Sequence, residues 1–170
     1  MSKIMRALPM RELLSRVAGE WAAKRSAFDI PEESVRRVLA LEASSPGFQF
    51  NGLRLALPVG PAAGPHTQIA PNLVAGWLAG SRVFELKTVQ VNDSLDIDKP
   101  CIDALDEGHN VEWSTELSLE EACAEYLRGW IAIHLLRAAL SSPEAEPGPV
   151  AFNMSVGYTL DGIKSERMDA

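Results

Sequence analysis

The first part of the chain has apolar residues at every third or fourth position, with charged residues between them. The apolar positions are Leu13, Leu14, Val17 and Trp21. This spacing is typical of an amphipathic helix. A second helix is expected to begin at Pro31, because proline suits the first helical turn and the acids Glu32 and Glu33 suit the positive end of the helix dipole. Residues 1–43 are therefore predicted to form a helical leader.

The pattern changes after the break at Ser44–Gly47. Apolar and polar residues alternate over 48–57 on both sides of Asn51–Gly52, which predicts a β-hairpin. Further along, the pattern predicts a helix over 69–78, a strand over 83–89, a helix from 119 to about 140 and a strand over 150–156. Ser118 and Glu121 suit a capping box for the long helix. The segment after Gly157 is expected to be a final loop.

This order of strand, loop, helix and strand predicts an α/β fold with parallel βα units. We expect the helical leader and the hairpin to be followed by the first three β/α units of a TIM barrel, within residues 44–170. A complete barrel takes about 250 residues. The chain has 170 residues, so the barrel is expected to be incomplete.

Composition narrows the class of protein. Apolar residues make up 46% and charged residues 23% of the chain, as in globular domains. The net charge of −7 disfavours a nucleic-acid partner and an anionic membrane surface. No apolar run is long enough for membrane insertion, and the N-terminal residues do not resemble a secretory signal. Two cysteines, Cys101 and Cys123, without a pairing pattern indicate a cytoplasmic protein.

Two weak motifs give little evidence for a phosphate-binding site or a metal site. The segment Gly157–Ser165 is close to a phosphate-binding P-loop, but Ile163 between Gly162 and Lys164 breaks the spacing. The spacings of Cys101, His109 and Cys123 match no zinc signature, so no metal site is predicted. A thiol nucleophile at Cys101 stays open, although acidic neighbours would oppose thiolate formation.

The loop Pro58–Pro65 is the strongest candidate for a binding site. It follows a strand and precedes a helix, the position at which β/α folds bind ligands. Its small residues Ala62, Ala63 and Gly64 allow a flat ligand to approach the backbone. A tight structural turn is an equally good interpretation of this composition.

Polar residues mark the next two strands. Lys87 stands in an apolar strand, where its charge is costly unless it is paired or meets an anionic ligand group; Thr88 follows it. A pair with Glu85 or with an acid from 93–121 is the alternative. On the last strand, Asn153 and Ser155 share a face. They are expected to supply hydrogen-bonding groups at the strand's carboxyl end, next to the candidate binding loop and Lys87.

Three segments, Pro58–Pro65, Glu85–Gln90 and Asn110–Glu116, resemble the dihydroorotate/dihydropyrimidine dehydrogenase superfamily of FMN-binding barrels. The runs 60–68, 99–104 and 152–158 are similar to the amino-terminal region of a family of proposed selenate reductase subunits, which are large flavin and iron–sulfur proteins. The resemblance extends from Ile4 to about Lys164, with the motifs in the same order.

The resemblance implies roles for individual residues. Ala62, Ala63 and Gly64 would lie beneath the flavin ring, and Lys87 and Thr88 would form hydrogen bonds with its pyrimidine edge. Asn153 would line the binding site at the end of the third strand. Asn110 and Glu112 match a segment that contacts a pyrimidine substrate in dihydropyrimidine dehydrogenases; Trp113 departs from that pattern. The acid/base residue of the family follows a fourth strand, so no catalytic residue is assigned. Iron–sulfur clusters and FAD belong to longer family members.

The sequence therefore predicts the amino-terminal part of a flavin-dependent oxidoreductase that supplies FMN-ring contacts. Its partners would be redox subunits or the continuation of its own chain, and the isolated chain is expected to bind FMN weakly or not at all. Two alternatives stay open: a non-catalytic docking module, and an inactive truncated product.

Overall fold

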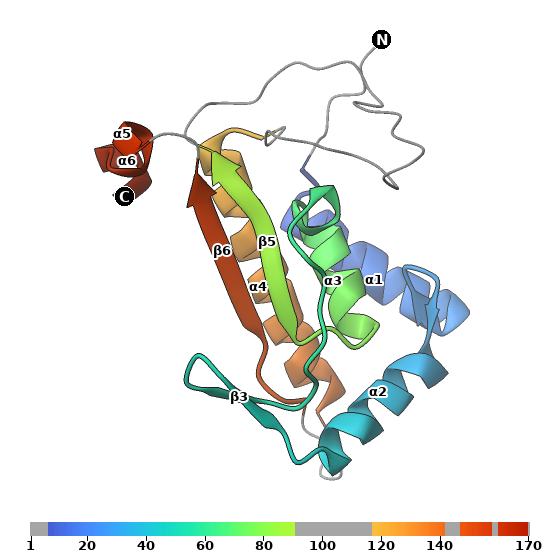
Figure 1. Ribbon diagram of the computed structural model, residues 1–170. Helices are drawn as coiled ribbons and strands as arrows, with labels where there is room; N and C mark the ends of the chain where they lie inside the picture. Colours follow the sequence, from blue (N-terminus) through green and yellow to red (C-terminus); the bar gives the residue numbers. More distant parts are fainter. Residues whose placement is uncertain (1–6, 91–116, 142–146, 158–159, 170) are drawn as a thin grey trace, which may run out of the picture.

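A computed structural model of the chain describes residues 7–90, 117–141, 147–157 and 160–169 (Figure 1). The leader contains helices α1 (Met10–Lys24) and α2 (Glu32–Ser44), as predicted. Pro31 is the N-cap of α2, and Glu32 and Glu33 lie in its first turn. The chain leaves α2 at Ser45, where the sequence predicted a break.

A short hairpin between the two helices was not predicted. It consists of β1 (Ser26–Ala27) and β2 (Ile30–Pro31), which pair antiparallel. Phe28 and Asp29 form its turn with φ of 50° and 60°. A two-residue type I′ turn requires positive φ at both central positions, which Asn-Gly usually supplies. The pair Phe-Asp carries no such signal, so the sequence did not reveal the turn.

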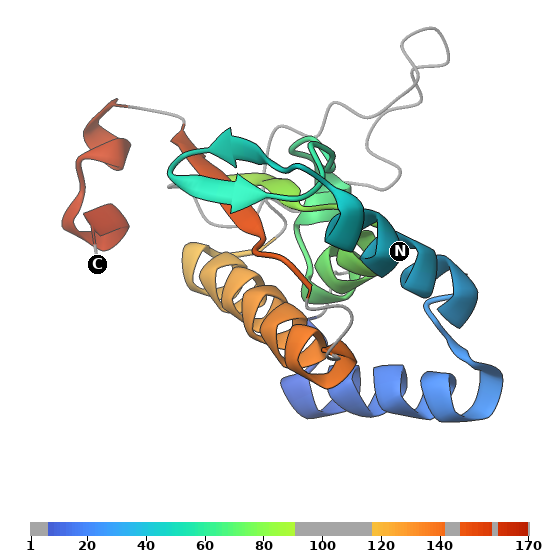
Figure 2. The same ribbon diagram turned by 90° about the horizontal axis from the view of Figure 1, so that it is seen from below.

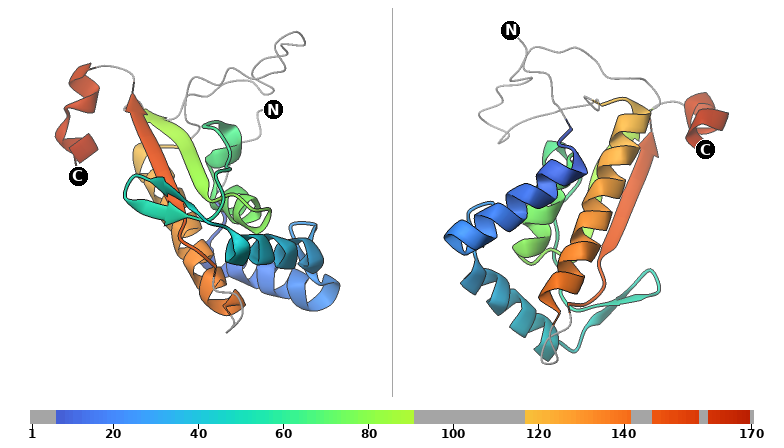
Figure 3. Two further views of the ribbon diagram at one scale, coloured as in Figure 1. Left: turned by 60° about the horizontal axis from the view of Figure 1, so that its bottom comes forward. Right: turned by 180° about the vertical axis from the view of Figure 1, so that it is seen from behind.

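The second hairpin, β3 (Phe48–Phe50) and β4 (Leu53–Leu55), confirms its prediction, although β4 ends two residues earlier than expected. Asn51 and Gly52 both have positive φ. In Figures 1 and 3 this hairpin lies near the ends where β5 and β6 begin, away from the carboxyl ends of these strands.

The βα units follow in the predicted order. A 3-10 turn η1 (Pro65–Thr67) leads into α3 (Ala70–Leu78), then β5 (Val83–Gln90), α4 (Leu119–Leu140) and β6 (Ala151–Gly157). β5 and β6 pair in parallel. The predicted capping box is present at the start of α4, where Ser118 and Glu121 bond each other's backbone N–H.

A third extended segment lies beside β5. The carbonyl of Val59 accepts from the N–H groups of Arg82 and Val83, and that of Pro61 accepts from Glu85. Both partners advance by two residues, so Val59–Pro61 runs parallel to β5 as a barrel strand would. The described residues thus form an α/β arrangement with a partial set of strands and no closed barrel.

Helices cover one face of the two-stranded sheet. Figure 3 shows α4 along β5 and β6, with α1 and α3 beside it, and Figure 2 shows α1 and α4 close together below the sheet. The fully buried side chains between these elements include Leu13, Leu73, Trp77, Phe84 and Ile133. Phe84 and Phe152 pack edge to face across the two strands, with ring centroids 5.2 Å apart.

The end of the chain differs from the predicted loop. It contains two one-turn helices, α5 (Leu160–Ile163) and α6 (Glu166–Asp169). Arg167 in α6 bonds both carboxylate oxygens of Glu120 at the start of α4, at 3.0 and 2.9 Å. The last segment is thereby attached to the long helix. Among the helices of the described ranges, none has the length and apolarity needed to cross a bilayer.

Candidate functional site

Residues 62–64, here called the Ala62–Gly64 loop, are held at their last residue by one side chain. The hydroxyl of buried Thr67 donates to the carbonyl of Gly64 at 3.0 Å and accepts from its N–H at 3.1 Å. Ala62 and Ala63 are exposed. The loop therefore presents two small, exposed side chains directly before a glycine whose backbone is held by Thr67.

Gly60 sets the position of this loop relative to β5. A Cβ atom added at Gly60 would lie 1.4 Å from the carbonyl oxygen of Val83. Only glycine permits so close an approach of two backbones. Because Pro61 bonds Glu85, the Ala62–Gly64 loop leaves its strand beside the segment that contains Lys87 and Thr88.

Lys87 and Thr88 lie in a β-bulge. Leu86 pairs with Met154 and Val89 with Val156, so β5 has one residue more than β6 in this interval. Bulges re-aim side chains and are common next to binding sites. Lys87 is 6% exposed and Thr88 is half-buried. The structure thus brings five predicted site residues, Ala62, Ala63, Gly64, Lys87 and Thr88, onto neighbouring segments.

Asn153 lies nearer the start of its strand than the sequence suggested; it was expected at the carboxyl end. It is the third residue of β6 and pairs with Glu85, two residues before Lys87. Its amide donates to Glu85 Oε2 at 2.5 Å, and the Ser155 hydroxyl donates to Glu85 Oε1 at 3.3 Å. The shared face of Asn153 and Ser155 is confirmed. The substrate candidates Asn110 and Glu112, together with Cys101 and His109, lie outside the described residues.

Three further polar side chains lie near these segments, and the sequence did not identify them as part of the candidate site. Gln68, directly after η1, is fully buried, and its amide has no hydrogen-bond partner among the described residues. Glu125 and Tyr126 of α4 are also buried, and each bonds a backbone group next to the candidate site. Burial raises the pKa of Tyr126 well above its ordinary value, so its hydroxyl stays protonated. A helical pattern alone does not separate such residues from ordinary core positions.

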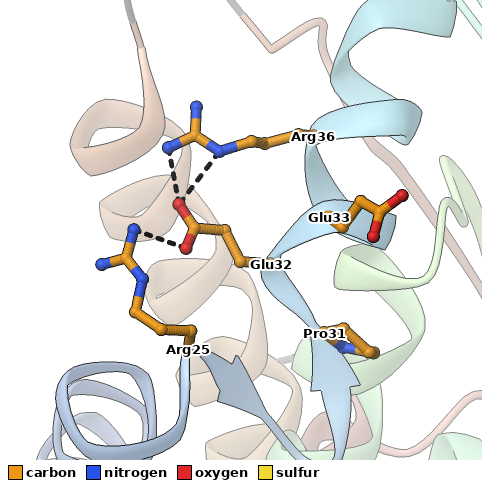
Figure 4. A pocket seen from close by; sticks show the side chains of 5 residues that line it. All are labelled: Arg25, Pro31, Glu32, Glu33 and Arg36. Atoms are coloured by element: carbon orange, nitrogen blue, oxygen red, sulfur yellow. Dashed lines mark hydrogen bonds and ion pairs between the residues drawn. The ribbon is translucent and has the colours of Figure 1, made fainter.

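A surface hollow at the start of α2 is lined by ion-paired side chains. Figure 4 shows the Glu32 carboxylate between the guanidinium groups of Arg25 and Arg36, with Glu33 turned away. The Nη2 atoms of both arginines lie 2.5 Å from Glu32 oxygens. The hydrogen bond from Arg36 lowers the pKa of Glu32, despite partial desolvation. Since these charges satisfy one another, the hollow offers little to a ligand.

Possible metal ligands do not gather in the described part of the chain. No group of three or more His, Cys, Asp or Glu side chains is placed there to hold a metal ion. Cys123 is an exposed free thiol on α4. His134, on the same helix, packs against Trp130 with ring centroids 4.2 Å apart, and desolvation lowers its pKa.

Comparisons with known proteins agree with this fold. Residues 28–170 match the family described as "Oxidoreductase YgfK, N-terminal TIM-barrel domain". Two relatives, both named "Putative oxidoreductase YgfK", from Escherichia coli K12 and Escherichia coli O157:H7, are each 49% identical over 168 residues. The alignment covers 99% of this chain and 16% of each relative. No solved structure matches the chain. With the parallel βα units and the matched residues, the chain belongs to the family of the YgfK N-terminal TIM-barrel domain.

Proposed function

We propose that this chain is the N-terminal part of an FMN-dependent oxidoreductase and supplies contacts to the flavin ring. The parallel backbone pairing of Val59–Pro61 with β5 carries the proposal. It sets the Ala62–Gly64 loop beside Lys87 and Thr88, in the carboxyl-terminal half of β5, and β/α folds bind ligands at the carboxyl ends of their strands. A bound flavin would supply the redox chemistry, and the protein would bind and orient it.

The chemistry of the residues suits the ring of a flavin. Ala62 and Ala63 offer small, exposed side chains to a flat ring. Lys87 is a buried cation on the adjacent strand, suited to the anionic pyrimidine edge of a reduced ring. Gln68 adds a buried amide whose donor and acceptor are unsatisfied among the described residues. An unsatisfied buried amide is costly, and such groups occur at binding sites.

The flavin phosphate requires other residues. In TIM barrels it is commonly held by the loops after strands seven and eight. The described residues form three parallel segments. We therefore assign the phosphate contacts to further segments of a longer polypeptide, consistent with the 16% of each relative that the chain covers. The isolated chain is expected to bind FMN weakly or not at all.

A chimera provides the test. This chain would replace the matching N-terminal part of the Escherichia coli relative, and FMN binding would be measured by quenching of flavin fluorescence. Lys87→Ala should weaken FMN binding about 10-fold or more, because one charge-assisted hydrogen bond is lost. Lys164→Ala, at an exposed position, is the charge-matched control and should have no effect. A chimera that folds but takes up no FMN, while the unaltered relative does, would contradict the proposal.

The electron acceptor can be tested in the same chimera. Selenate is the acceptor that the family resemblance suggests, in a cytoplasmic enzyme with redox subunits as partners. The flavin would be reduced with dithionite, and its absorbance followed after selenate is added. Reoxidation faster than with sulfate would support selenate reduction. Equal rates would remove selenate from the proposal and leave the flavin site untouched.

A second candidate function is docking without flavin. Leu127, Ile131 and Leu135 are 54%, 42% and 49% exposed and lie four residues apart, so they form one apolar stripe along α4. The function would then be association with a redox subunit. Lys87→Ala that leaves flavin content unchanged, together with Ile131→Lys that abolishes subunit association, would favour this function.

A further inference from the structure

We propose that Glu125 and Tyr126, consecutive residues of α4, are positioning residues for the candidate flavin site. The inference rests on the proposed function for its purpose. Tyr126 would hold the Lys87 segment, and Glu125 would hold the start of α3, which follows the Ala62–Gly64 loop. One turn of α4 would thus set the distance between the Lys87 segment and the start of α3, into which the Ala62–Gly64 loop leads.

Tyr126 acts on the bulge. Its hydroxyl donates to the carbonyl oxygen of Lys87 at 2.6 Å, and its side chain is 5% exposed. A bulge disrupts the regular ladder of the sheet, so a backbone group there benefits from a side-chain partner. The hydrogen bond fixes the peptide that follows Lys87, and with it the direction in which Lys87 and Thr88 project.

Glu125 holds the start of α3. Its Oε2 accepts from the N–H of Ala70, the first residue of α3, at 2.8 Å. The first N–H groups of a helix lack partners within the helix, and a carboxylate there is also favoured by the helix dipole. Glu125 is fully buried, and its second oxygen pairs with Arg128. The buried charge is therefore compensated from both sides.

The helical geometry of α4 allows Glu125 to reach Ala70 and Tyr126 to reach Lys87 from adjacent positions. Consecutive side chains on a helix point about 100° apart, so Glu125 and Tyr126 reach different neighbours from one turn. α4 packs against both α3 and β5, as Figure 1 shows. Neither residue needs to touch a ligand, and both would act through the segments they hold.

The first experiment concerns the 170-residue chain without flavin. Tyr126→Phe removes only the hydroxyl, so amide hydrogen exchange over residues 84–90 should accelerate more than exchange elsewhere. Glu125→Gln should do the same at the start of α3. Glu12→Gln, at an exposed position of α1, is the control. Uniform acceleration, or none, would overturn the positioning role whether or not flavin binds.

The second experiment measures FMN affinity in the chimera. Tyr126→Phe should raise the FMN dissociation constant several-fold, and the effect should be clearly smaller in a Lys87→Ala background, because one of the two side chains that Tyr126 positions is then absent. Equal effects in both backgrounds would show a general loss of structure and overturn the inference. If the unsubstituted chimera folds but binds no FMN, while the unaltered relative does, the proposed function fails, and the exchange experiment alone decides the positioning role.

Discussion

The guanidinium of Arg82 lies against the carboxylate of Glu42 in a two-fold contact, with Nε–Oε1 at 2.7 Å and Nη2–Oε2 at 2.6 Å. Their side chains are 1% and 2% exposed. Arg82 also donates to the carbonyls of Trp77 and Ser81, and Glu42 accepts from the N–H of Gly148. The pair therefore connects the leader to the start of β5 and to the approach to β6.

Glu42→Gln tests this connection. The substitution leaves the Arg82 charge buried without its counterion, so the free energy of unfolding should fall by about 3–5 kcal/mol. Urea denaturation of both proteins measures the difference. Glu33→Gln is the matched control, because Glu33 and Arg37 form an ion pair with 76% and 75% exposed side chains, and it should cost at most about 1 kcal/mol. Equal losses at the two positions would contradict a structural role for the buried pair.

Gly60→Ala tests the approach of Val59–Pro61 to β5. The new Cβ would lie 1.4 Å from the Val83 carbonyl oxygen, so the segment must move away and its hydrogen bonds to β5 must break. We expect a loss of about 2 kcal/mol or more in the free energy of unfolding, measured by thermal or urea unfolding. Gly19→Ala is the control: Gly19 lies within α1 with no atom near its added Cβ, so alanine should stabilise by up to about 1 kcal/mol.

Gly129→Ala tests the packing of α4 on α3. An added Cβ would lie 2.6 Å from Cδ1 and 3.2 Å from Cβ of Leu73, which is fully buried. Overpacking of this kind costs about 1–3 kcal/mol. A double variant with Leu73→Ala should lose less than the sum of the two single variants, because the smaller side chain removes the clash. Additive losses in a urea-unfolding cycle would show that the two residues do not interact.

The elements with local signals were predicted well from the sequence. Asn51–Gly52 identified the β3–β4 hairpin, because these residue types readily adopt the positive φ that the turn needs. Ser118 and Glu121 identified the start of α4, since a capping box depends on residues three positions apart. The turn at Phe28–Asp29 was missed because phenylalanine rarely adopts positive φ and no glycine follows Asp29, so the usual turn signal is absent.

Features that depend on distant residues could not be predicted. The Arg82–Glu42 pair joins positions forty residues apart, and neither residue has a local pattern that points to the other. Val59–Pro61 was interpreted as a loop because of its proline, and only its hydrogen bonds to β5 reveal it as a strand-like segment. Glu125 and Tyr126 are ordinary helix positions in sequence. Their role depends on β5 and the start of α3, which the fold brings to them.

The contact between α6 and α4 should depend on pH. The hydrogen bonds from Arg167 lower the pKa of Glu120 from 4.5 to about 2. A carboxyl group with a lowered pKa stabilises the folded contact above its ordinary pKa, and this contribution is lost as the pH falls from about 4.5 toward 2. A carboxyl ¹³C NMR titration would follow Glu120 directly. Arg167→Gln should return its pKa toward the ordinary value, whereas Lys164→Gln, at an exposed position on the same segment, should not. An ordinary pKa of Glu120 in the unsubstituted chain would mean that α6 does not dock on α4 in solution.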